Sequence, residues 1–314
     1  MLRSIAALAL RCVSKHEAAG VAGSRSELET GALLDMTFAA PAQPSALAAK
    51  GPAARVRGRL RGRIIIGVLP IATAAGVLIV WEAIVRGLKI SPVILPSPSQ
   101  VYQKVITVLP LLVDNSVQTG GEAVLGLVLA AAVGIALGSA LAYSKYFRAA
   151  VYPNLVFFQL IPKVALAPLF VIWLGIGIES RLTFTIFITF FPIAISTAVG
   201  LASIDPIYVR FSRGLTATDW QTFKHIRVPF ALPAIFAGLK IGVTMAFIGV
   251  IVAEFITSQS GLGYLILFAM ARTETAVVLG SIAFLCVIGI GVYGAVALLE
   301  VMIRRVWGAP YDAG

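Results

Sequence analysis

The segment RFSRGLTATDWQTFKHIRVPFALP, residues 210–233, lies between two long apolar stretches and carries charged side chains along most of its length. Such a segment cannot lie in hydrocarbon, because unpaired charges and unsatisfied backbone groups are costly there. Its larger apolar residues follow helical spacing, which predicts an amphipathic helix: Leu215, Trp220, Phe223 and Ile226. We expect Pro229 and Pro233 to end that helix and to open the next one. The segment is therefore either a docking surface outside the membrane or an ordinary loop helix.

Composition favours a membrane protein. Hydrophobic residues make up 59% of the 314-residue chain and charged residues 12%, whereas a soluble domain carries about 25% charged residues. The net charge of +11 would suit a nucleic-acid-binding protein, but ten of the 25 basic residues fall in residues 1–63 and most others flank apolar stretches. That distribution is typical of the positive-inside rule and of anionic lipid. We therefore expect membrane lipid, and no nucleic acid, as a partner.

The segment at residues 210–233 resembles the cytoplasmic coupling loop of ABC-importer permeases, whose pattern is Glu-Ala-Ala-x3-Gly-x9-Ile-x-Leu-Pro. With the final proline placed on Pro229, Ile226 and Val228 match the Ile and Leu of the pattern. Thr216 stands where the family has Gly, and Arg210-Phe211-Ser212 where it has Glu-Ala-Ala. The C-terminal half of the segment therefore matches the family pattern, and the N-terminal half differs from it.

Further pieces within residues 63–305 are similar to the sulfonate/nitrate/taurine branch of that family, which includes pyrimidine-precursor permeases. They are Trp220-Gln221, Leu232-Pro233, Ala237-Gly238-Leu239-Lys240, Ala253-Glu254-Phe255 and Gly261-Leu262-Gly263-Tyr264. The resemblance implies an all-α membrane protein with the type I ABC importer permease fold, in the bacterial inner membrane. It implies a second permease copy, a cytoplasmic ATP-binding cassette ATPase and an extracytoplasmic substrate-binding protein as partners. The family's solutes are small: sulfonates, taurine, nitrate or pyrimidine precursors.

The resemblance assigns coupling to the ATPase to a cytoplasmic segment at residues 205–229, which we expect to move as one helix. Together with the apolar face, it names these coupling residues: Leu215, Thr216, Ala217, Asp219, Trp220, Phe223, Ile226 and Pro229.

Residues 1–54 are rich in Ala, Ser and Gly and are predicted to form a disordered cytoplasmic tail. Their opening imitates a signal peptide, but the apolar stretch at residues 5–10 is shorter than the usual region of about 7–15 residues. The membrane domain is predicted over residues 55–314. It opens on alternating arginines that we expect to anchor the first span on the inner side: Arg55, Arg57, Arg59, Arg61 and Arg63.

Six stretches are long enough to cross about 30 Å of hydrocarbon at roughly 20 residues each. They are residues 64–81, 123–144, a span within 149–178, 182–204, 230–258 and 275–299. In the second of them, glycines are expected to permit close helix contacts: Gly126, Gly134 and Gly138. After the first span, Ser99 is the expected N-cap of a further helix. The apolar stripe of that helix is expected to lie on the outer membrane face: Val101, Val105, Leu109 and Leu112.

Basic residues beside the spans predict the orientation. One set of flanks holds the five arginines of residues 55–63 together with Lys145, Arg148, Arg210, Arg213, Lys224, Arg227, Arg304 and Arg305. The opposite set holds Arg86, Lys89, Lys104, Arg181 and Arg272, partly offset by acidic residues that include Glu122 and Glu179. Thirteen basic residues against five predict six spans with the N and C termini in the cytoplasm.

Charges inside spans are expensive and are functional candidates by default. Lys240 and Glu254 lie near one face of the fifth span but roughly 21 Å apart along it, so they are expected to mark two levels of one translocation pathway. The alternatives are a Lys240 side chain that snorkels to the headgroups and an interfacial Glu254.

Pro162 and Pro168 predict a broken helix in the third span, and broken helices at membrane depth usually line cavities. Gln159 and Lys163, four residues apart, are expected on one face of it and to line the pathway, where a positive charge suits an anionic solute. The alternative is a kinked packing helix.

We find no nucleophile–base set, metal-ligand spacing or nucleotide-binding motif in the sequence, since Gly261-Leu262-Gly263 lacks a following Gly-Lys. The chain is therefore predicted to be a non-catalytic subunit without a metal or cofactor, and the energy is expected from the ATPase partner. A secondary transporter working without ATP is the alternative. It would need inverted repeats and ion-coupling carboxylates near mid-membrane.

Overall fold

The computed structural model describes residues 52–257 and 259–307, and the side chains of residues 69–257 and 259–306. Contacts divide the chain into two units, Met1–Ile65 and Ile66–Gly314. The predicted tail at residues 1–54 lies outside the described residues except for its last three, which open helix α2. All side-chain contacts below belong to the second unit.

Regular structure is helical throughout the described residues. In chain order the elements are α2 (Pro52–Gly87), α3 (Pro98–Thr107), α4 (Leu109–Tyr143), α5 (Lys145–Leu160), η1 (Lys163–Leu166), α6 (Ala167–Leu174), α7 (Ile178–Ala202), α8 (Pro206–Gly214), α9 (Asp219–Thr222), η2 (Phe223–Arg227), α10 (Val228–Thr257), α11 (Leu262–Ala271) and α12 (Thr275–Trp307). Within residues 52–257 and 259–307, five helices are long and apolar enough to cross a membrane, and the bent pair Lys145–Leu160 and Lys163–Leu174 would make a sixth. These spans correspond to the six predicted ones.

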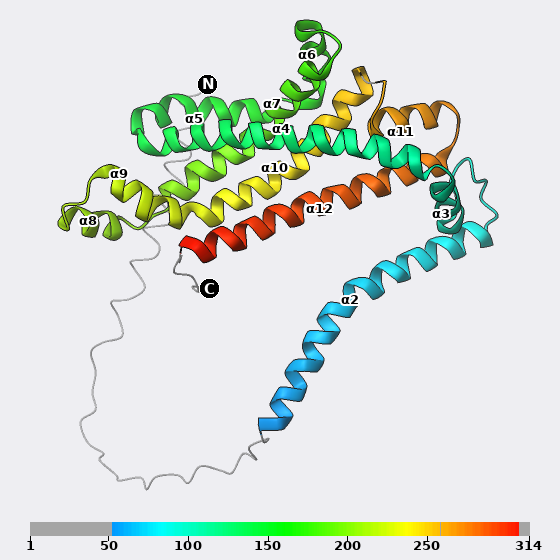
Figure 1. Cartoon of the computed structure of the whole chain (residues 1–314), viewed down its shortest axis with the longest axis horizontal. Coiled ribbons are helices and arrows are strands. Elements are labelled where there is room, and N and C mark those ends of the chain that lie inside the picture. Colours follow the sequence, from blue (N-terminus) through cyan, green and yellow to red (C-terminus); the bar gives the residue numbers. More distant parts are fainter. Residues whose placement is uncertain (1–51, 258, 308–314) are drawn as a thin grey trace, which may run out of the picture. The chain divides into compact units, whose positions relative to one another are not determined.

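Helices α4, α7, α10 and α12 run alongside one another in the bundle (Figure 1). The glycines of α4 allow its backbone to approach α7 closely, as predicted. A Cβ at Gly138 would lie 2.6 Å from the Ala194 carbonyl oxygen, and a Cβ at Gly126 would lie 2.6 Å from Thr185 Cγ2. Small residues matter at such contacts because lipid tails are as apolar as the side chains, so close packing drives association between membrane helices.

The third span is broken, as its prolines predict. Helix α5 ends at Leu160, a 3-10 turn follows Pro162, and α6 leaves at 89° to α5 with Pro168 in its first turn. Phe170 of α6 packs edge-to-face on Phe184 of α7, with ring centroids 5.5 Å apart. The break also separates Gln159 from Lys163, so the expectation that they share one helix face is wrong.

The segment at residues 205–229 is not the single helix that was expected. Helix α8 ends at Gly214, and the chain turns at Thr216, whose φ of 58° lies in the left-handed region that favours glycine. Thr216 stands where the family pattern has Gly, so the turn explains that family position.

Pro229 was expected to end the amphipathic helix, but the helix that begins at Asp219 continues through Pro229 to Thr257. A π turn at η2 precedes the proline, and the Val228 N–H bonds to the Phe223 carbonyl oxygen. This wider turn interrupts the regular α-helical ladder just where the proline would otherwise disturb it.

The helix after the first span also differs from its prediction. Its N-cap is Ser97, whose N–H donates to the Gln100 side chain at 2.9 Å, and Ser99 instead binds the Glu82 carboxylate through its N–H and hydroxyl. Val105 and Leu112 pack inward with residues of α11 and α12. Two of the four stripe residues therefore pack against α11 and α12, whereas Leu109 is 41% exposed.

Candidate coupling surface and translocation pathway

Helices α8 and α9 are short, and polar caps hold them in place. Asp205 Oδ1 accepts the Ile207 N–H at 2.9 Å at the start of α8. At the start of α9, Thr218 and Gln221 form a reciprocal capping box. A buried hydrogen bond between the Ser212 and Thr222 hydroxyls, 3.0 Å long, ties the two helices together. The two helices therefore form an ordered unit between α7 and α10 and not an irregular loop.

Large apolar side chains on this pair face away from the bundle. We name as the coupling surface the exposed side chains of Ile207, Phe211, Leu215 and Trp220. The Phe211 side chain is 67% exposed and the Trp220 side chain 70% exposed. Neither ring is buried against the helix bundle. An exposed cluster of large apolar side chains marks an interaction site.

The predicted coupling residues divide between this surface and the bundle. Leu215, Thr216, Asp219 and Trp220 are exposed, whereas Ala217, Phe223, Ile226 and Pro229 are half-buried. Phe223 packs against the core of Leu201, Ala231 and Ile235, and its ring stacks on Trp220 at 5.7 Å. Sequence reasoning missed Ile207 and Phe211; their i, i+4 spacing ahead of Leu215 was the signal that could have found them.

The four predicted pathway residues lie in separate surroundings. Gln159 is exposed at the end of α5. Lys163 is half-buried, with its Nζ 4.7 Å from the centre of the Phe191 ring. The Lys240 ammonium pairs with Glu300 of α12 at 2.7 Å and lies 5.8 Å from the Tyr293 ring centre. Glu300 therefore neutralises the Lys240 charge in part, since the same carboxylate also pairs with Arg304.

Glu254 holds the start of α11. Its carboxylate is buried and accepts a hydrogen bond from the Thr119 hydroxyl and another from the Gly263 N–H, both 2.7 Å long. Thr119 in turn accepts the Leu262 N–H at 2.8 Å. These bonds satisfy backbone donors in the first turn of α11, which would otherwise lack partners. Helices α4, α10 and α11 are thus fastened at one point by Glu254, which is buried in the bundle three residues before the end of α10.

A buried ion pair joins α4 to α7 near this cluster. The Arg181 guanidinium donates to both oxygens of Glu122, at 2.9 and 2.6 Å. Each residue lies one position outside a span predicted from hydropathy, so both were taken as flanking charges. Helix α4 begins at Leu109 and α7 at Ile178, which places the two charges within the helices and lets them neutralise each other.

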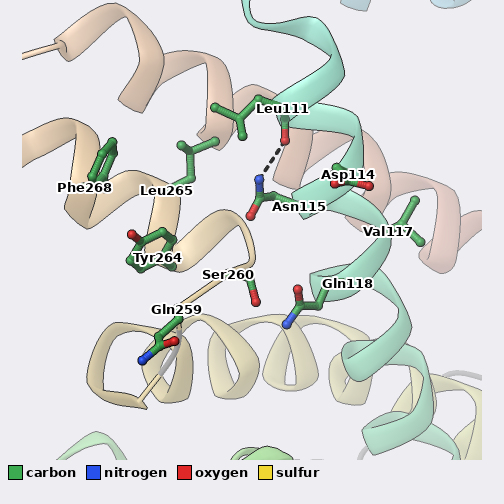
Figure 2. Close-up of a pocket in the computed structure, with 10 residues that line it drawn as sticks. All are labelled: Leu111, Asp114, Asn115, Val117, Gln118, Gln259, Ser260, Tyr264, Leu265 and Phe268. Carbon is green, nitrogen blue, oxygen red and sulfur yellow. Dashed lines mark hydrogen bonds between the residues drawn. The ribbon is translucent and has the colours of Figure 1, made fainter.

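A hollow of about 590 Å³ opens between the start of α4 and the loop before α11 (Figure 2). Its lining combines aliphatic and aromatic side chains with amides, a hydroxyl and one carboxylate: Leu111, Asp114, Asn115, Val117, Gln118, Gln259, Ser260, Tyr264, Leu265 and Phe268. Figure 2 shows the Gln118, Gln259 and Tyr264 side chains around the opening. Asn115 is structural, since it donates to the Leu111 carbonyl and accepts the Gly261 N–H, each at 2.7 Å. None of these residues is among the four predicted pathway residues.

A family model described as "Binding-protein-dependent transport system inner membrane component" matches residues 130–307, more than half of the chain. The chain belongs to this family. The match contains the coupling surface, Lys163, Lys240 and Glu254, but not Glu122.

Relatives agree with the family and with the predicted branch. The permease is 35% identical to the formylaminopyrimidine transport permease of Halalkalibacterium halodurans, over 71% of this chain and 89% of that protein. It is 34% identical to the riboflavin transport system permease of Chloroflexus aurantiacus, over 74% and 87% of the two chains. It is 32% identical to the taurine transport system permease of Escherichia coli, over 70% and 82%. The permease is thus a multi-pass inner membrane component of an ABC transport system, as predicted.

Glu254→Gln is expected to loosen the first turn of α11 in the permease. The Thr119 hydroxyl and the Gly263 N–H donate to different oxygens of Glu254, and glutamine replaces one of these oxygens with an NH2 group that donates. A hydrogen bond to a charged group contributes about 1.5–3 kcal/mol. Hydrogen exchange of the α11 amides should therefore quicken by at least about tenfold. Glu274→Gln is the matched control, because the Glu274 side chain is 41% exposed and pairs with Lys104 at 3.2 Å. Equal exchange in Glu254→Gln and the parent protein would show that the carboxylate does not hold α11.

Proposed function

We propose that this chain is the non-catalytic transmembrane subunit of an importer, and that two copies form the pathway for a small solute delivered by an extracytoplasmic binding protein. A separate cytoplasmic ATPase docks on the coupling surface and drives the change of access. The observation that carries this proposal is the exposed apolar surface of α8 and α9, formed by a segment too polar to lie in hydrocarbon. Apolar side chains that are exposed to water outside the spans are stabilised when a partner protein covers them.

The coupling surface is well connected to the spans behind it. Phe223 packs against Leu201 at the end of α7 and against Ala231 and Ile235 of α10. The chain also runs as one helix from Asp219 to Thr257. A push on Trp220 would therefore be transmitted along α10 toward Glu254 and α11, since packed helices behave as rigid elements.

A second copy is supported by the faces of the outer helices. None of the apolar window of α12 is buried, and 6% of the window of α2 is. On α12, a Cβ at Gly289, Gly291 or Gly294 would have no atom within 4 Å apart from chain neighbours and its own helix backbone. Small residues on an open membrane face allow close approach of another helix. The predicted orientation, with both termini in the cytoplasm, remains part of the proposal.

The proposed solutes are those of the branch: a pyrimidine precursor, a sulfonate, taurine or nitrate. The relatives' names give formylaminopyrimidine, riboflavin and taurine as the compounds that they transport. We propose that Gln159, Lys163, Lys240 and Glu254 act along the pathway, with Lys240 and Glu254 acting through the contacts that they make with α12 and α11.

Purification of the tagged permease in mild detergent tests the assembly. An ATPase should co-purify, and the mass of the complex should correspond to two permease and two ATPase chains. A monodisperse permease without an ATPase, isolated from cells that make the complete transport system, would contradict the proposal.

Lys163→Met is expected to reduce uptake about tenfold, which corresponds to the loss of about 1.4 kcal/mol of attraction between the ammonium and the solute. Lys163→Arg should retain more activity because the positive charge survives. Lys145→Met is the control, because Lys145 also lies over a ring, that of Tyr146 at 5.1 Å, but is exposed at the start of α5. Uptake is measured at equal membrane levels. Near-normal uptake in both Lys163 variants would make Lys163 a packing residue.

A further inference from the structure

A basic hollow of about 400 Å³ lies where α4 and α7 end, beneath α8 and η2. Three guanidinium groups line it: Arg210 and Arg213 of α8 and Arg227 of η2. The remaining lining is mostly apolar and comes from Ala142, Leu201, Ala202, Ile204, Pro206 and Val209. The lining of the hollow therefore combines three cationic residues with six apolar ones.

The charges of this hollow are not neutralised by the described part of the chain. Neither Arg210 nor Arg227 has a hydrogen-bond or ion-pair partner on its side chain among residues 69–257 and 259–306. Arg213 pairs with Asp219 at 3.6 Å, and both side chains are largely exposed, so that pair contributes little. Three like charges that share one hollow repel each other, and an anion between them would relieve the repulsion.

Phosphate oxygens fit this arrangement better than a single carboxylate does. Arginine presents a planar fork of donors that binds phosphate with two parallel hydrogen bonds, and three such forks exceed what one carboxylate can accept. The apolar lining of the hollow adds a place for hydrocarbon next to the anion. A ligand with both parts is a phospholipid whose headgroup carries a net negative charge.

The position of the hollow agrees with such a ligand. Helix α4 ends at Tyr143 and α7 at Ala202, so the hollow lies at the level where the apolar spans stop. Exposed aromatic residues mark the same end, namely Tyr143, Tyr146 and Tyr208, and aromatic belts lie at the headgroup level of membranes. Basic residues at this level attract anionic lipid.

We propose that the hollow of Arg210, Arg213 and Arg227 binds the phosphate group of an anionic phospholipid. The lipid would connect α8, which carries part of the coupling surface, with η2, which continues into α10. A bound lipid would thus hold the coupling surface in place against the ends of the spans.

The test uses the full-length permease with its co-purified ATPase in neutral detergent, and measures retained lipid by native mass spectrometry. The probes are phosphatidylglycerol and, as the neutral comparison, phosphatidylcholine. The parent protein should retain phosphatidylglycerol selectively, and Arg210→Gln/Arg227→Gln should retain at least tenfold less of it. The control, Arg148→Gln/Arg305→Gln, loses the same charge outside the hollow and should behave as the parent does.

A third variant, Arg210→Lys/Arg227→Lys, keeps the charge and should retain part of the binding, which separates a loss of the site from misfolding. Equal retention of phosphatidylglycerol by the glutamine variant and its control would overturn the proposal. Binding of inorganic phosphate by the parent protein without selective retention of phosphatidylglycerol would assign the hollow to the free anion and reject the lipid. Unchanged lipid retention with lost ATPase co-purification would assign the arginines to an acidic surface of the ATPase, which also contradicts the proposal.

Discussion

Arg181→Gln is expected to remove most of the folded permease from the membrane. Arg181 and Glu122 are joined by two short hydrogen bonds, and their side chains are only 11% and 6% exposed. Loss of one partner leaves the other charge buried and unpaired, which costs about 3–5 kcal/mol. That is a large part of the roughly 5–15 kcal/mol that separates a typical folded domain from its unfolded chain. The readouts are the membrane level of the protein and the midpoint of thermal unfolding in detergent.

Two comparisons separate the ion pair from other effects of the substitution. Arg86→Gln removes an arginine from a pair with Glu82 in which the Arg86 side chain is 69% exposed, and it should lower the midpoint little. The double variant Glu122→Leu/Arg181→Met removes both charges and should recover part of the stability that either single change loses. If Arg181→Gln reached the level and midpoint of the parent, the pair would have no structural importance.

Trp220→Ala is expected to weaken ATPase docking more than tenfold while leaving the permease folded. A large aromatic side chain near the centre of an interface costs at least about 2 kcal/mol when it is truncated. The Trp220 side chain is exposed and contacts Phe223 by stacking, so its removal leaves the bundle core intact. Charges at the rim, such as Asp219 and Lys224, should matter less because solvent screens them. The measurements are membrane level, ATPase co-purification and solute-stimulated ATP hydrolysis.

Trp173→Ala is the matched control for Trp220→Ala. Trp173 is similarly exposed at the end of α6 and also contacts one ring, that of Phe170 at 5.7 Å. It lies outside the coupling surface and should leave docking unchanged. A fall in membrane level alone in Trp220→Ala would make the tryptophan a packing residue, and normal behaviour in all three assays would remove it from the interface.

Hydropathy predicted the membrane spans because each contains a long uncharged stretch, and Pro162 predicted the break between α5 and α6 because the proline ring disrupts a helix. The ends of the helices were less predictable. Helix α4 begins fourteen residues before the predicted start at 123, since a helix continues wherever its polar groups find partners. Glu122 of α4 pairs with Arg181 of α7, and a local sequence pattern cannot predict an ion-pair partner 59 positions away.

The same reason explains what sequence reasoning missed at the candidate site. Glu300 was overlooked because the sixth span was expected to end at residue 299, yet α12 continues to Trp307 and brings Glu300 to Lys240. The turn at Thr216 was missed because threonine does not favour a positive φ, so the residue itself gave no signal for it. Long-range partners and unusual backbone angles depend on the assembled fold and not on local spacing.

Uptake into proteoliposomes tests the central claim most directly. The permease is reconstituted with its co-purified ATPase and binding protein, and the entry of a labelled solute is followed with ATP on the ATPase side, without ATP, and with an imposed proton or sodium gradient. The account predicts uptake that requires ATP, ATPase and binding protein together and is strongly reduced by Trp220→Ala. Uptake driven by an ion gradient in liposomes that contain the permease alone would contradict it.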